Sequence, residues 1–286
     1  MQRIKSVLTE AAGILAASSD SAILDAEVLL CLVLEKERSY LRAWPDKPLQ
    51  PEQINRFSTL IKRRQEGTPV AYITGNREFW SRDFHVTPDV LIPRPDTELL
   101  IELSLKLIPA DKPFRIIDLG TGSGIIAITL AAERPHAHVS ATDISSAALR
   151  IAKLNANKHH INHIEFYQSD WFANVPVARF NLIISNPPYI AEDDSHLQQG
   201  DVRFEPQTAL CAADKGLRDI KTIADAARER LESGGYLLVE HGYDQQDTVQ
   251  AIFKDFHYEN VQTVNDLSGQ PRVTYGQIQP KDDFCG

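Results

Sequence analysis

Several features that mark special classes of protein are scarce in this sequence. It has three cysteines, Cys31, Cys211 and Cys285, and they are far apart with no Cys-x-x-Cys pair. A scattered, odd set of cysteines argues against a disulfide framework and a zinc cluster, so we expect a reducing, cytoplasmic setting and no metal. No stretch approaches the roughly 20 apolar residues of a membrane-spanning helix, so we expect no membrane association.

An excess of basic residues is also missing. The formal net charge is -9, whereas proteins that hold long nucleic acids depend on surplus Lys and Arg. Residues 1–75 are nearly balanced, with ten basic against nine acidic side chains, so the acidity belongs to the rest of the chain. The composition weakens the case for a nucleic-acid substrate without excluding it, and we expect no stable nucleic-acid binding.

The first 75 residues follow a helical period. Apolar residues recur at three- and four-residue spacing over Ile4–Leu15, Ile23–Leu34 and Pro51–Arg64. The first stretch could be mistaken for a signal peptide, but Glu10 interrupts its apolar run and favours an amphipathic helix. Residues 1–75 are therefore predicted to form a small helical bundle.

The pattern changes near Gly75. Aromatic and polar residues alternate over Arg77–Leu91, with Ser81-Arg82-Asp83 as the expected turn, which predicts a β-hairpin linker at residues 76–95. A helix at Thr97–Leu107 is followed by β-rich runs that alternate with helical ones. This order predicts a doubly wound parallel sheet in residues 96–286. The strand candidates are Arg115–Leu119, His138–Thr142, Ile164–Gln168, Phe180–Ser185 and Gly235–Glu240.

A glycine-rich turn follows the first strand candidate. Asp118-Leu119-Gly120-Thr121-Gly122-Ser123-Gly124 leaves the strand and enters a helix predicted at Ile125–Glu133. Glycines permit a tight turn and close approach of a ligand, and a helix N-terminus offers free N–H groups. Such turns also serve nicotinamide and flavin cofactors, or only allow tight packing, so the turn leaves its ligand open.

Two further strand ends carry residues suited to adenosine. Asp143 lies 19 residues after Gly124, where a carboxylate would accept hydrogen bonds from both ribose hydroxyls. It could instead cap the next helix, although Ser145 can take that role. Asp170-Trp171 follows the third strand and offers an acceptor for the adenine amino group and an aromatic face, although a tryptophan taken alone more often serves core packing. We expect these residues in one crevice at the carboxyl edge of the sheet.

The fourth strand candidate ends in Asn186-Pro187-Pro188-Tyr189. Two prolines fix the backbone and remove two N–H donors, which makes a rigid turn suited to accepting hydrogen bonds. An amide nitrogen is a poor nucleophile because its lone pair is delocalised. If the Asn186 side-chain oxygen and the Pro187 carbonyl accept its N–H groups while Tyr189 stacks on the planar group, the nitrogen faces a methyl donor without a metal. The turn predicts methyl transfer to a planar amide or amine nitrogen.

Together these motifs resemble those of class I S-adenosylmethionine methyltransferases. Pro69-Val70-Ala71-Tyr72-Ile73-Thr74-Gly75, Phe79-Trp80 and Leu91-Ile92-Pro93-Arg94-Pro95-Asp96-Thr97-Glu98 resemble, more narrowly, the linker of the bacterial release-factor glutamine methyltransferases, the PrmC or HemK family. The likeness covers nearly the whole chain. Two departures are Asp96, where many relatives have Glu, and Ala212-Ala213, where many have Gly-Gly.

The resemblance implies N5-methylation of the glutamine in the Gly-Gly-Gln motif of class I peptide chain release factors, with S-adenosylhomocysteine as the product. It implies a seven-stranded sheet completed by Tyr258–Val264 and Arg272–Gln277 as an antiparallel final hairpin, and an N-terminal bundle that grips the release factor. It assigns cofactor contacts to Gly120–Gly124, Asp143, Trp171 and Asn186, and substrate contacts to Asn186–Tyr189. Asp170 and Arg94 are weaker assignments. Arg203-Phe204-Glu205-Pro206 resembles a segment that covers the substrate, with an Arg–Glu surface pair as the alternative.

Two other functions stay open on these motifs. A DNA adenine-N6 or RNA guanine-N2 methyltransferase faces the same chemical problem at a base amine and uses a similar turn. The acidic charge and the small, balanced N-terminal region argue against it. A nicotinamide oxidoreductase or a noncatalytic nucleotide-binding module would use the glycine turn, but it leaves Asn186–Tyr189 unexplained.

Overall fold

The computed structural model describes residues 2–279, which form two compact units. The first unit combines the chain up to Asn76 with residues 195–204, and the second contains residues 77–194 and the chain from Glu205 onward. Cys285 and the last residues of the predicted 96–286 domain lie outside the described part. The return of residues 195–204 to the first unit is not among the sequence predictions.

The first unit is helical, as the spacing predicts. Its core is formed by the apolar stripes of α1, α2 and α4, with Leu15, Leu29 and Phe57 almost fully buried. Gln50 precedes α4 and forms a capping box with Gln53, and Pro51 opens the helix with its fixed φ. The elements are α1 (Ile4–Leu15), α2 (Ala22–Leu34), α3 (Arg38–Ala43), α4 (Pro51–Gln65), α5 (Val70–Thr74), η2 (Ser195–Gln198) and η3 (Val202–Phe204).

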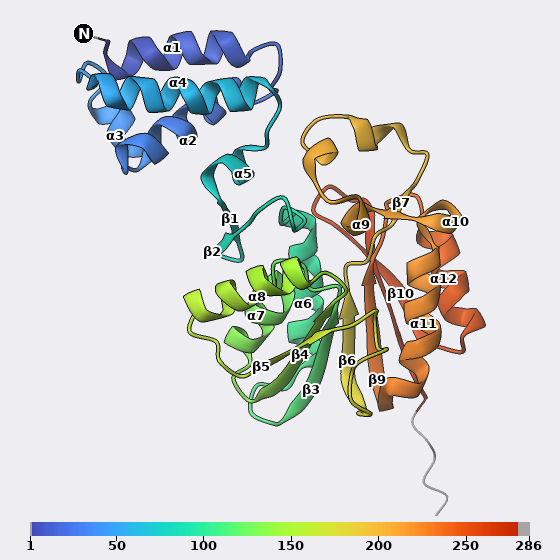
Figure 1. The fold of residues 1–286 in the computed structure, drawn as a ribbon. Helices are drawn as coiled ribbons and strands as arrows, with labels where there is room; N and C mark the ends of the chain where they lie inside the picture. Colours follow the sequence, from blue (N-terminus) through green and yellow to red (C-terminus); the bar gives the residue numbers. More distant parts are fainter. Residues whose placement is uncertain (1, 280–286) are drawn as a thin grey trace, which may run out of the picture. The chain divides into compact units, whose positions relative to one another are not determined.

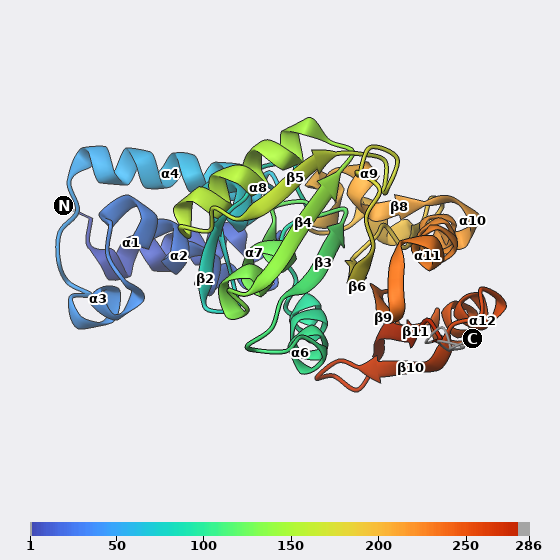
Figure 2. The same ribbon diagram turned by 90° about the horizontal axis from the view of Figure 1, so that it is seen from below.

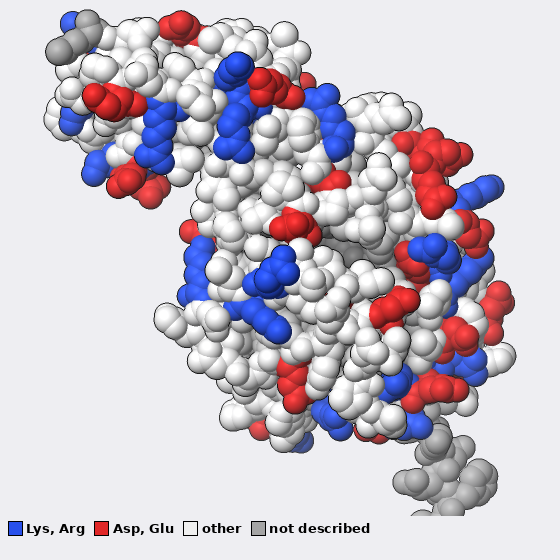
Figure 3. Space-filling view, viewed as in Figure 1, with Lys and Arg blue, Asp and Glu red and all other residues white. Residues whose placement is uncertain are grey.

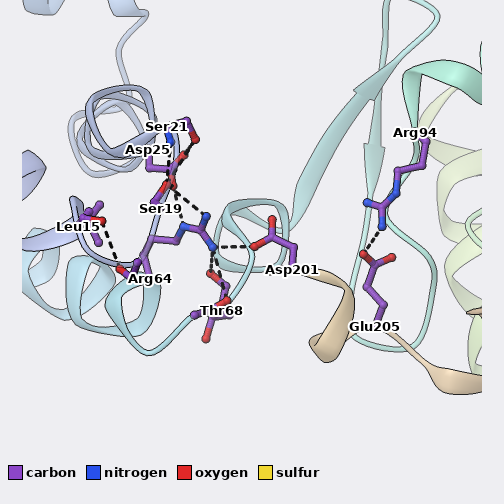
Figure 4. A network of polar contacts seen from close by, with 11 residues as sticks. Leu15, Ser19, Ser21, Asp25, Arg64, Thr68, Arg94, Asp201 and Glu205 are labelled. Atoms are coloured by element: carbon purple, nitrogen blue, oxygen red, sulfur yellow. Dashed lines mark hydrogen bonds and ion pairs between the residues drawn. The ribbon is translucent and has the colours of Figure 1, made fainter. Parts of the chain in front are cut away.

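A network of ion pairs and hydrogen bonds centred on buried Arg64 connects these helices to residues 195–204 (Figure 4). Arg64 of α4 donates from Nε to Asp25 Oδ2 at 2.7 Å and from Nη1 to Asp201 Oδ1 at 2.8 Å. The hydroxyls of Ser19 and Ser21 donate to the same Asp25 carboxylate at 2.7 and 2.8 Å. Because each buried charge has charged or polar partners, these interactions offset the free-energy cost of removing the Arg64 guanidinium from water.

The predicted hairpin is present, but its turn was misplaced. Strands β1 (Asn76–Phe79) and β2 (Arg82–His85) pair in a two-stranded sheet. The turn falls at Trp80 and Ser81, whose φ angles are 52° and 57°. Positive φ at both central residues matches the twist of paired strands. The sequence pointed instead to Ser81-Arg82-Asp83, because a tryptophan seldom adopts positive φ.

The second unit is built on a seven-stranded sheet in the order β10-β11-β9-β6-β3-β4-β5. The pairs of β11 with β10 and with β9 are antiparallel and the other neighbouring strands pair in parallel, so the predicted fold class is confirmed. The helices α6, α7 and α8 pack on one face and α11 and α12 on the other (Figures 1 and 2). The strands are β3 (Phe114–Leu119), β4 (Ala137–Asp143), β5 (Ile164–Gln168), β6 (Phe180–Ser185), β9 (Leu231–Glu240), β10 (Glu259–Asn265) and β11 (Pro271–Gln277).

Alternating side chains divide the core between the two faces of the sheet. On β3, Ile116 joins the cluster under α6 and α7, whereas Ile117 joins the cluster under α11 and α12. On β6, Leu182 and Ile184 take the first face and Ile183 takes the second. Both faces are covered, which explains why these strands are almost continuously apolar. The helices are α6 (Glu98–Leu107), α7 (Ile125–Glu133), α8 (Ser146–Lys158), α11 (Arg218–Arg230) and α12 (Gln246–Asp255).

The strand order creates a switch point beside β3. The chain continues from β3 to β4 and β5 on one side and then returns to β6 on the other. Crossover helices therefore diverge at the carboxyl ends of β3 and β6, where ligands bind in sheets of this type. Short elements border this edge: η1 (Pro95–Thr97), β7 (Ile190–Ala191), α9 (Gln207–Leu210), β8 (Cys211–Ala212) and α10 (Ala213–Gly216).

Charged side chains of both signs share the surface shown in Figure 3, where Lys and Arg alternate with Asp and Glu over each unit. Among the described residues, no helix has both the length and the apolar composition needed to cross a membrane.

Candidate active site

A cavity of about 510 Å³ opens at the carboxyl edge of the sheet in the second unit. It is lined by residues that follow β3, β4, β5 and β6, by the segment before α6, and by the segment from Pro206 to Cys211. The motif residues on its wall are Gly120, Thr121, Gly122, Ser123, Asp143, Asp170, Trp171, Asn186 and Pro188. The sequence prediction that these motifs share one crevice is therefore met for those residues.

The glycine turn adopts the positive φ angles that its glycines allow. Gly124 has a φ of 85°, and a Cβ there would lie 2.8 Å from Ile128 Cδ1. Any other residue at Gly124 is disfavoured by both its backbone and its packing. The turn is fastened from both sides, because Thr121 N donates to Thr142 O at 2.8 Å and Gly122 N donates to Asp143 Oδ2 at 2.9 Å.

Asp118 lies beneath this turn, and no role followed for it from the sequence. Its Oδ2 accepts hydrogen bonds from Thr121 Oγ1 at 2.6 Å and from Ala127 N at 3.3 Å. Burial raises the pKa of the Asp118 carboxyl to about 7. Asp118 therefore ties β3, the turn and the first residues of α7 together. Its place at the head of the glycine motif was the signal available in the sequence.

Asp143 ends β4, and each oxygen of its carboxylate already accepts one hydrogen bond. Oδ2 accepts from Gly122 N, and Oδ1 accepts from Ser145 N at 2.8 Å. Ser145 caps α8, because its side chain accepts from Ala148 N at 3.1 Å, as the sequence suggested. Burial raises the pKa of Asp143 above its ordinary value. Since a carboxylate has about four lone-pair sites, two remain for a ligand in the cavity.

Trp171 and Asp170 follow β5. Trp171 has a φ of 46°, and its ring lies over the glycine turn, with Cζ3 3.4 Å from the position of a Cβ on Gly120. The indole lines the cavity and also packs against the core cluster of α11, so both sequence interpretations describe part of its position. Asp170 is exposed at the cavity wall.

The Asn186–Tyr189 turn divides its side chains between the cavity and the protein. Asn186 and Pro188 line the cavity, whereas Pro187 is buried and Tyr189 packs against the second core cluster. Asn186 Nδ2 donates to Thr97 Oγ1 at 3.1 Å. The Tyr189 hydroxyl donates to Glu240 Oε1 at 3.3 Å. The structure thus places Tyr189 beside Glu240, outside the residues that line the cavity.

Glu240 ends β9 next to β6 and was also missed in the sequence. It is 1% exposed, and burial raises the pKa of its carboxyl to about 7. The Tyr189 hydroxyl hydrogen-bonds Oε1 and lowers this pKa in opposition to burial, while Oε2 has no hydrogen-bond partner among residues 2–279. Its neighbour His241 has a lowered pKa because burial disfavours the charged imidazole. Only the pairing of β6 with β9 brings Glu240 to the turn.

Known proteins match both regions of the chain. A family model described as the PrmC N-terminal domain matches residues 6–75, and one described as the methyltransferase small domain matches residues 96–204. The release factor glutamine methyltransferase of Shewanella oneidensis is 50% identical over 263 residues, which cover 92% of each chain. The enzyme of the same name from Escherichia coli is 47% identical over 260 residues, 91% of this chain and 94% of its own.

The chain belongs to the release factor glutamine methyltransferase family. This family is S-adenosylmethionine-dependent, and the sequence-based recognition is confirmed. Solved structures agree on the fold of the second unit. A methyltransferase from Pyrococcus furiosus aligns with a TM-score of 0.54 at 14% identity, over 78% of this chain and 99% of its own. A 16S rRNA N2 methyltransferase of T. thermophilus aligns with a TM-score of 0.53 at 18% identity, over 71% of this chain and 50% of its own.

The structure shows how two segments that resemble or depart from the family pattern are placed. The surface-pair interpretation of Arg203 and Glu205 is wrong: Glu205 is buried, forms an ion pair with Arg94 and accepts from Ile92 N at 3.0 Å. The Arg203 guanidinium lies over the Phe204 ring instead, 4.9 Å from its centroid. Glu205 thereby fastens two walls of the methyltransferase cavity, the segment before α6 and the segment before α9.

The second segment is Ala212-Ala213, where many relatives have Gly-Gly, and the backbone there is one that alanine can adopt. Ala212 has a φ of -129°, and the positive φ angles of this loop fall on Asp214, Lys215 and Gly216. Alanine is therefore compatible with both positions. Among residues 2–279, no group of three or more His, Cys, Asp or Glu is arranged to hold a metal ion.

Proposed function

We propose that this chain transfers the methyl group of S-adenosylmethionine to the side-chain N5 nitrogen of the glutamine in the Gly-Gly-Gln motif of class I peptide chain release factors. The observation that carries the proposal is the position of Asn186. It follows β6 at the switch point, on the same cavity wall as the glycine turn and Asp143, so its amide faces the space where methyl donor and acceptor would meet.

The cavity residues fit the methyl donor. The two unused lone-pair sites of Asp143 suit the ribose hydroxyls, and the indole of Trp171 suits the adenine ring. The glycine turn allows the methionine part to approach the backbone closely. The bound cofactor supplies an electrophilic methyl group on a positively charged sulfur. We assign cofactor binding to Gly120, Thr121, Gly122, Ser123, Gly124, Asp143, Asp170, Trp171 and Asn186.

The Asn186 turn prepares the acceptor nitrogen. Since Asn186 Nδ2 is engaged by Thr97, its Oδ1 is left to accept one N–H of the glutamine amide. The Pro187 carbonyl accepts the other, and the two prolines keep N–H donors away from the nitrogen. The nitrogen forms its bond to the methyl carbon as the carbon–sulfur bond breaks, the sulfur keeps the electron pair, and the nitrogen then releases a proton to water. Positioning and fixed dipoles supply the catalysis.

Tyr189 completes this proposal as a support of the acceptor group. Tyr189 packs against the core and only Pro188 of the pair lines the cavity, so the substrate role that we assign to Tyr189 is to support the turn on which the glutamine amide rests. Burial beside Glu240 raises the pKa of the phenol above its ordinary value, so Tyr189 stays neutral and serves as a flat, uncharged surface.

We further propose that the helical unit, predicted from residues 1–75, docks on the body of the release factor. The support is the match of residues 6–75 to the PrmC N-terminal domain. The kcat/KM for the intact release factor should then greatly exceed that for a short Gly-Gly-Gln peptide. Equal values for the factor and the peptide would contradict a docking role.

A labelling experiment tests the proposed acceptor. The protein is incubated with methyl-labelled S-adenosylmethionine and either an unmodified release factor, the same factor with the Gly-Gly-Gln glutamine changed to alanine, or DNA and RNA. Label is expected on the unmodified factor only. Equal label on the alanine variant would overturn the glutamine assignment, and label on nucleic acid would favour the alternative base methyltransferase.

A further inference from the structure

The Asn186–Tyr189 turn is held differently at its two ends. At its entry it continues β6, where Ser185 pairs with Leu119 of β3 and with Val239 of β9, and the Ser185 hydroxyl donates to Leu119 O at 2.8 Å. At its exit the chain leaves the seven-stranded sheet for the two-residue strand β7, which pairs with β8. The sheet therefore fixes the first end of the turn, and other contacts must fix the second.

One of these contacts is made by the side chain of Gln245, in the loop after β9. Its Nε2 donates to Tyr189 O at 3.0 Å and to Lys215 O at 3.2 Å, and its Oε1 accepts from Gly242 N at 2.8 Å. A main-chain N–H can only donate and a carbonyl can only accept, so these partners decide the orientation of the Gln245 amide. Gln245 is 9% exposed. It joins the exit of the turn to two other loops.

Gly216 touches the same carbonyl from another side. Its φ is 82°, and a Cβ there would lie 2.0 Å from Tyr189 O and 2.6 Å from Tyr189 C. Glycine is the residue that lets two backbones approach this closely. The two residues before it, Asp214 and Lys215, each have a φ of 55° although neither is glycine. Such a conformation is unfavourable and persists where surrounding contacts impose it, so the 214–216 loop is held against the turn.

The stiffness of the turn carries these contacts to the reacting group. Pro187 and Pro188 fix their own φ angles and restrict the residue before each, so Asn186–Tyr189 moves nearly as one piece. A displacement at Tyr189 O is then passed to the Pro187 carbonyl, the assigned acceptor for one N–H of the glutamine amide. A misplacement of about 1 Å at the reacting atoms, caused by a distant substitution, can cost about a hundredfold in rate.

We propose that Gln245 and Gly216 are positioning residues that set the exit of the Asn186–Tyr189 turn, and with it the Pro187 carbonyl, against the methyl acceptor. Neither Gln245 nor Gly216 lines the cavity. The proposal deepens the proposed function and rests on it for the identity of the acceptor. Loss of either residue should slow methyl transfer without loss of cofactor binding, because the glycine turn and Asp143 belong to β3 and β4.

Gln245→Met is the first test. Methionine has the length of glutamine but no N–H to donate to Tyr189 O. The rate of a single turnover, with cofactor and release factor both saturating, should fall by about tenfold or more. The KM for the release factor and the Kd for S-adenosylhomocysteine should change little. Gln245→Glu keeps an acceptor for Gly242 N but, once ionised, places an oxygen against two carbonyls, so it should be at least as slow as Q245M.

The matched control is Gln250→Met. Gln250 of α12 donates from Nε2 to Thr263 Oγ1 of β10 at 2.9 Å, and it does not line the cavity. The same chemical change there should leave the single-turnover rate unchanged. A wild-type rate in Q245M or in Q245E, or an equal loss in Q250M, would overturn the positioning role of Gln245.

Gly216→Ala tests the other contact of the same carbonyl. Its methyl group would displace Tyr189 O, so methyl transfer should slow by about tenfold or more while S-adenosylhomocysteine still binds. Gly269→Ala is the control for backbone strain, because Gly269 has a φ of 81° and nothing lies within 4 Å of a Cβ there. Equal losses in G216A and G269A would overturn the role of Gly216. If G216A does not fold, the comparison of Q245M with Q250M decides.

Hydrogen exchange separates this inference from the proposed function. A peptide containing residues 189–192 should exchange its amide protons faster in Q245M than in the wild type or Q250M, because the exit of the turn loses an anchor. A peptide containing residues 118–124 should not change. If the wild type fails to label the release factor while the exchange responds as stated, the proposed acceptor is wrong and the positioning stands. Unchanged exchange at residues 189–192 in Q245M would overturn the positioning whatever the substrate.

Discussion

Asp143 shows how one side chain can serve the fold and the ligand together. Its carboxylate accepts N–H groups from Gly122 and Ser145, and two lone-pair sites remain on a residue that lines the cavity. An asparagine has an oxygen on one side only, so it can accept from Gly122 N or from Ser145 N but not from both, and its NH2 group offers no acceptor to a ribose hydroxyl. D143N should therefore weaken S-adenosylhomocysteine binding by about tenfold or more, since hydrogen bonds to charged groups contribute about 1.5–3 kcal/mol. Calorimetric titration measures the Kd.

The control for D143N is Asp255→Asn, at the exposed end of α12 and away from the cavity. It should bind S-adenosylhomocysteine as the wild type does. An unchanged Kd in D143N would remove Asp143 from the cofactor site.

Asp118 makes stability depend on pH. Burial raises its pKa from the ordinary 3.8 to about 7, so between these pH values the folded chain holds a proton that the unfolded chain has released. The free energy of unfolding must then fall as pH rises through this range, by at most about 1.4 kcal/mol per pH unit for one proton. Asp118→Asn does not titrate. Urea unfolding of D118N should give a shallower fall between about pH 5 and 7 than the wild type.

Part of this slope should persist in D118N, because burial also raises the pKa of Glu240 to about 7. Exposed Asp255 offers the comparison, and D255N should keep the full wild-type slope. Parallel curves for D118N and the wild type would show that Asp118 is already ionised in the folded chain.

At the scale of elements, residues 195–204 are the segment whose position the sequence pattern least explains. They follow the Asn186 turn and β7, yet they belong to the helical unit, where Asp201 pairs with Arg64. The side chain of Asp201 is 42% exposed, so its pair contributes little, whereas Arg64 also balances buried Asp25. Removing Arg64 would leave that carboxylate buried without its charged partner.

Arg64→Met should therefore destabilise the helical unit by about 3–5 kcal/mol, whereas Asp201→Ala should cost less than about 1 kcal/mol. D201A should nevertheless loosen its own segment, and trypsin should cut after exposed Arg203 faster than in the wild type. Urea unfolding and the rate of cleavage separate the two effects. Equal stability losses in both variants would contradict the central place of Arg64 in the network.

For the whole molecule, ligand selectivity should appear as a change in thermal stability. A ligand that binds only the folded chain raises the free energy of unfolding, by about 2.7 kcal/mol at a ligand concentration of 100 times its Kd. The melting temperature rises accordingly. S-adenosylhomocysteine should do so and NAD should not, because the cavity combines a glycine turn with the Asn186 turn of a methyltransferase. Equal shifts with both ligands would favour a general nucleotide-binding site.

Much of this architecture was already determined by the order of residues along the chain. Period-two and helical spacing placed β5 and β6 at their observed bounds, and the strand-to-helix alternation gave the parallel sheet. The motifs that follow β3, β4, β5 and β6 could be joined into one site, because parallel strands end at the same edge. Each of these inferences depends on local pattern or on a general rule of sheet topology.

Only the tertiary structure decided the contacts between segments that are distant in sequence. Glu240 meets the Asn186 turn through the pairing of β9 with β6, Glu205 forms a direct ion pair with Arg94, and Asp201 meets Arg64 in the helical unit. A single acidic residue in the sequence gives no local sign of its partner, because the residues around a buried carboxylate do not differ in pattern from those around an exposed one. The chemistry at Asn186 could be inferred from four residues, but the hydrogen bond from its side chain to Thr97, 89 residues away in sequence, exists only in the folded chain.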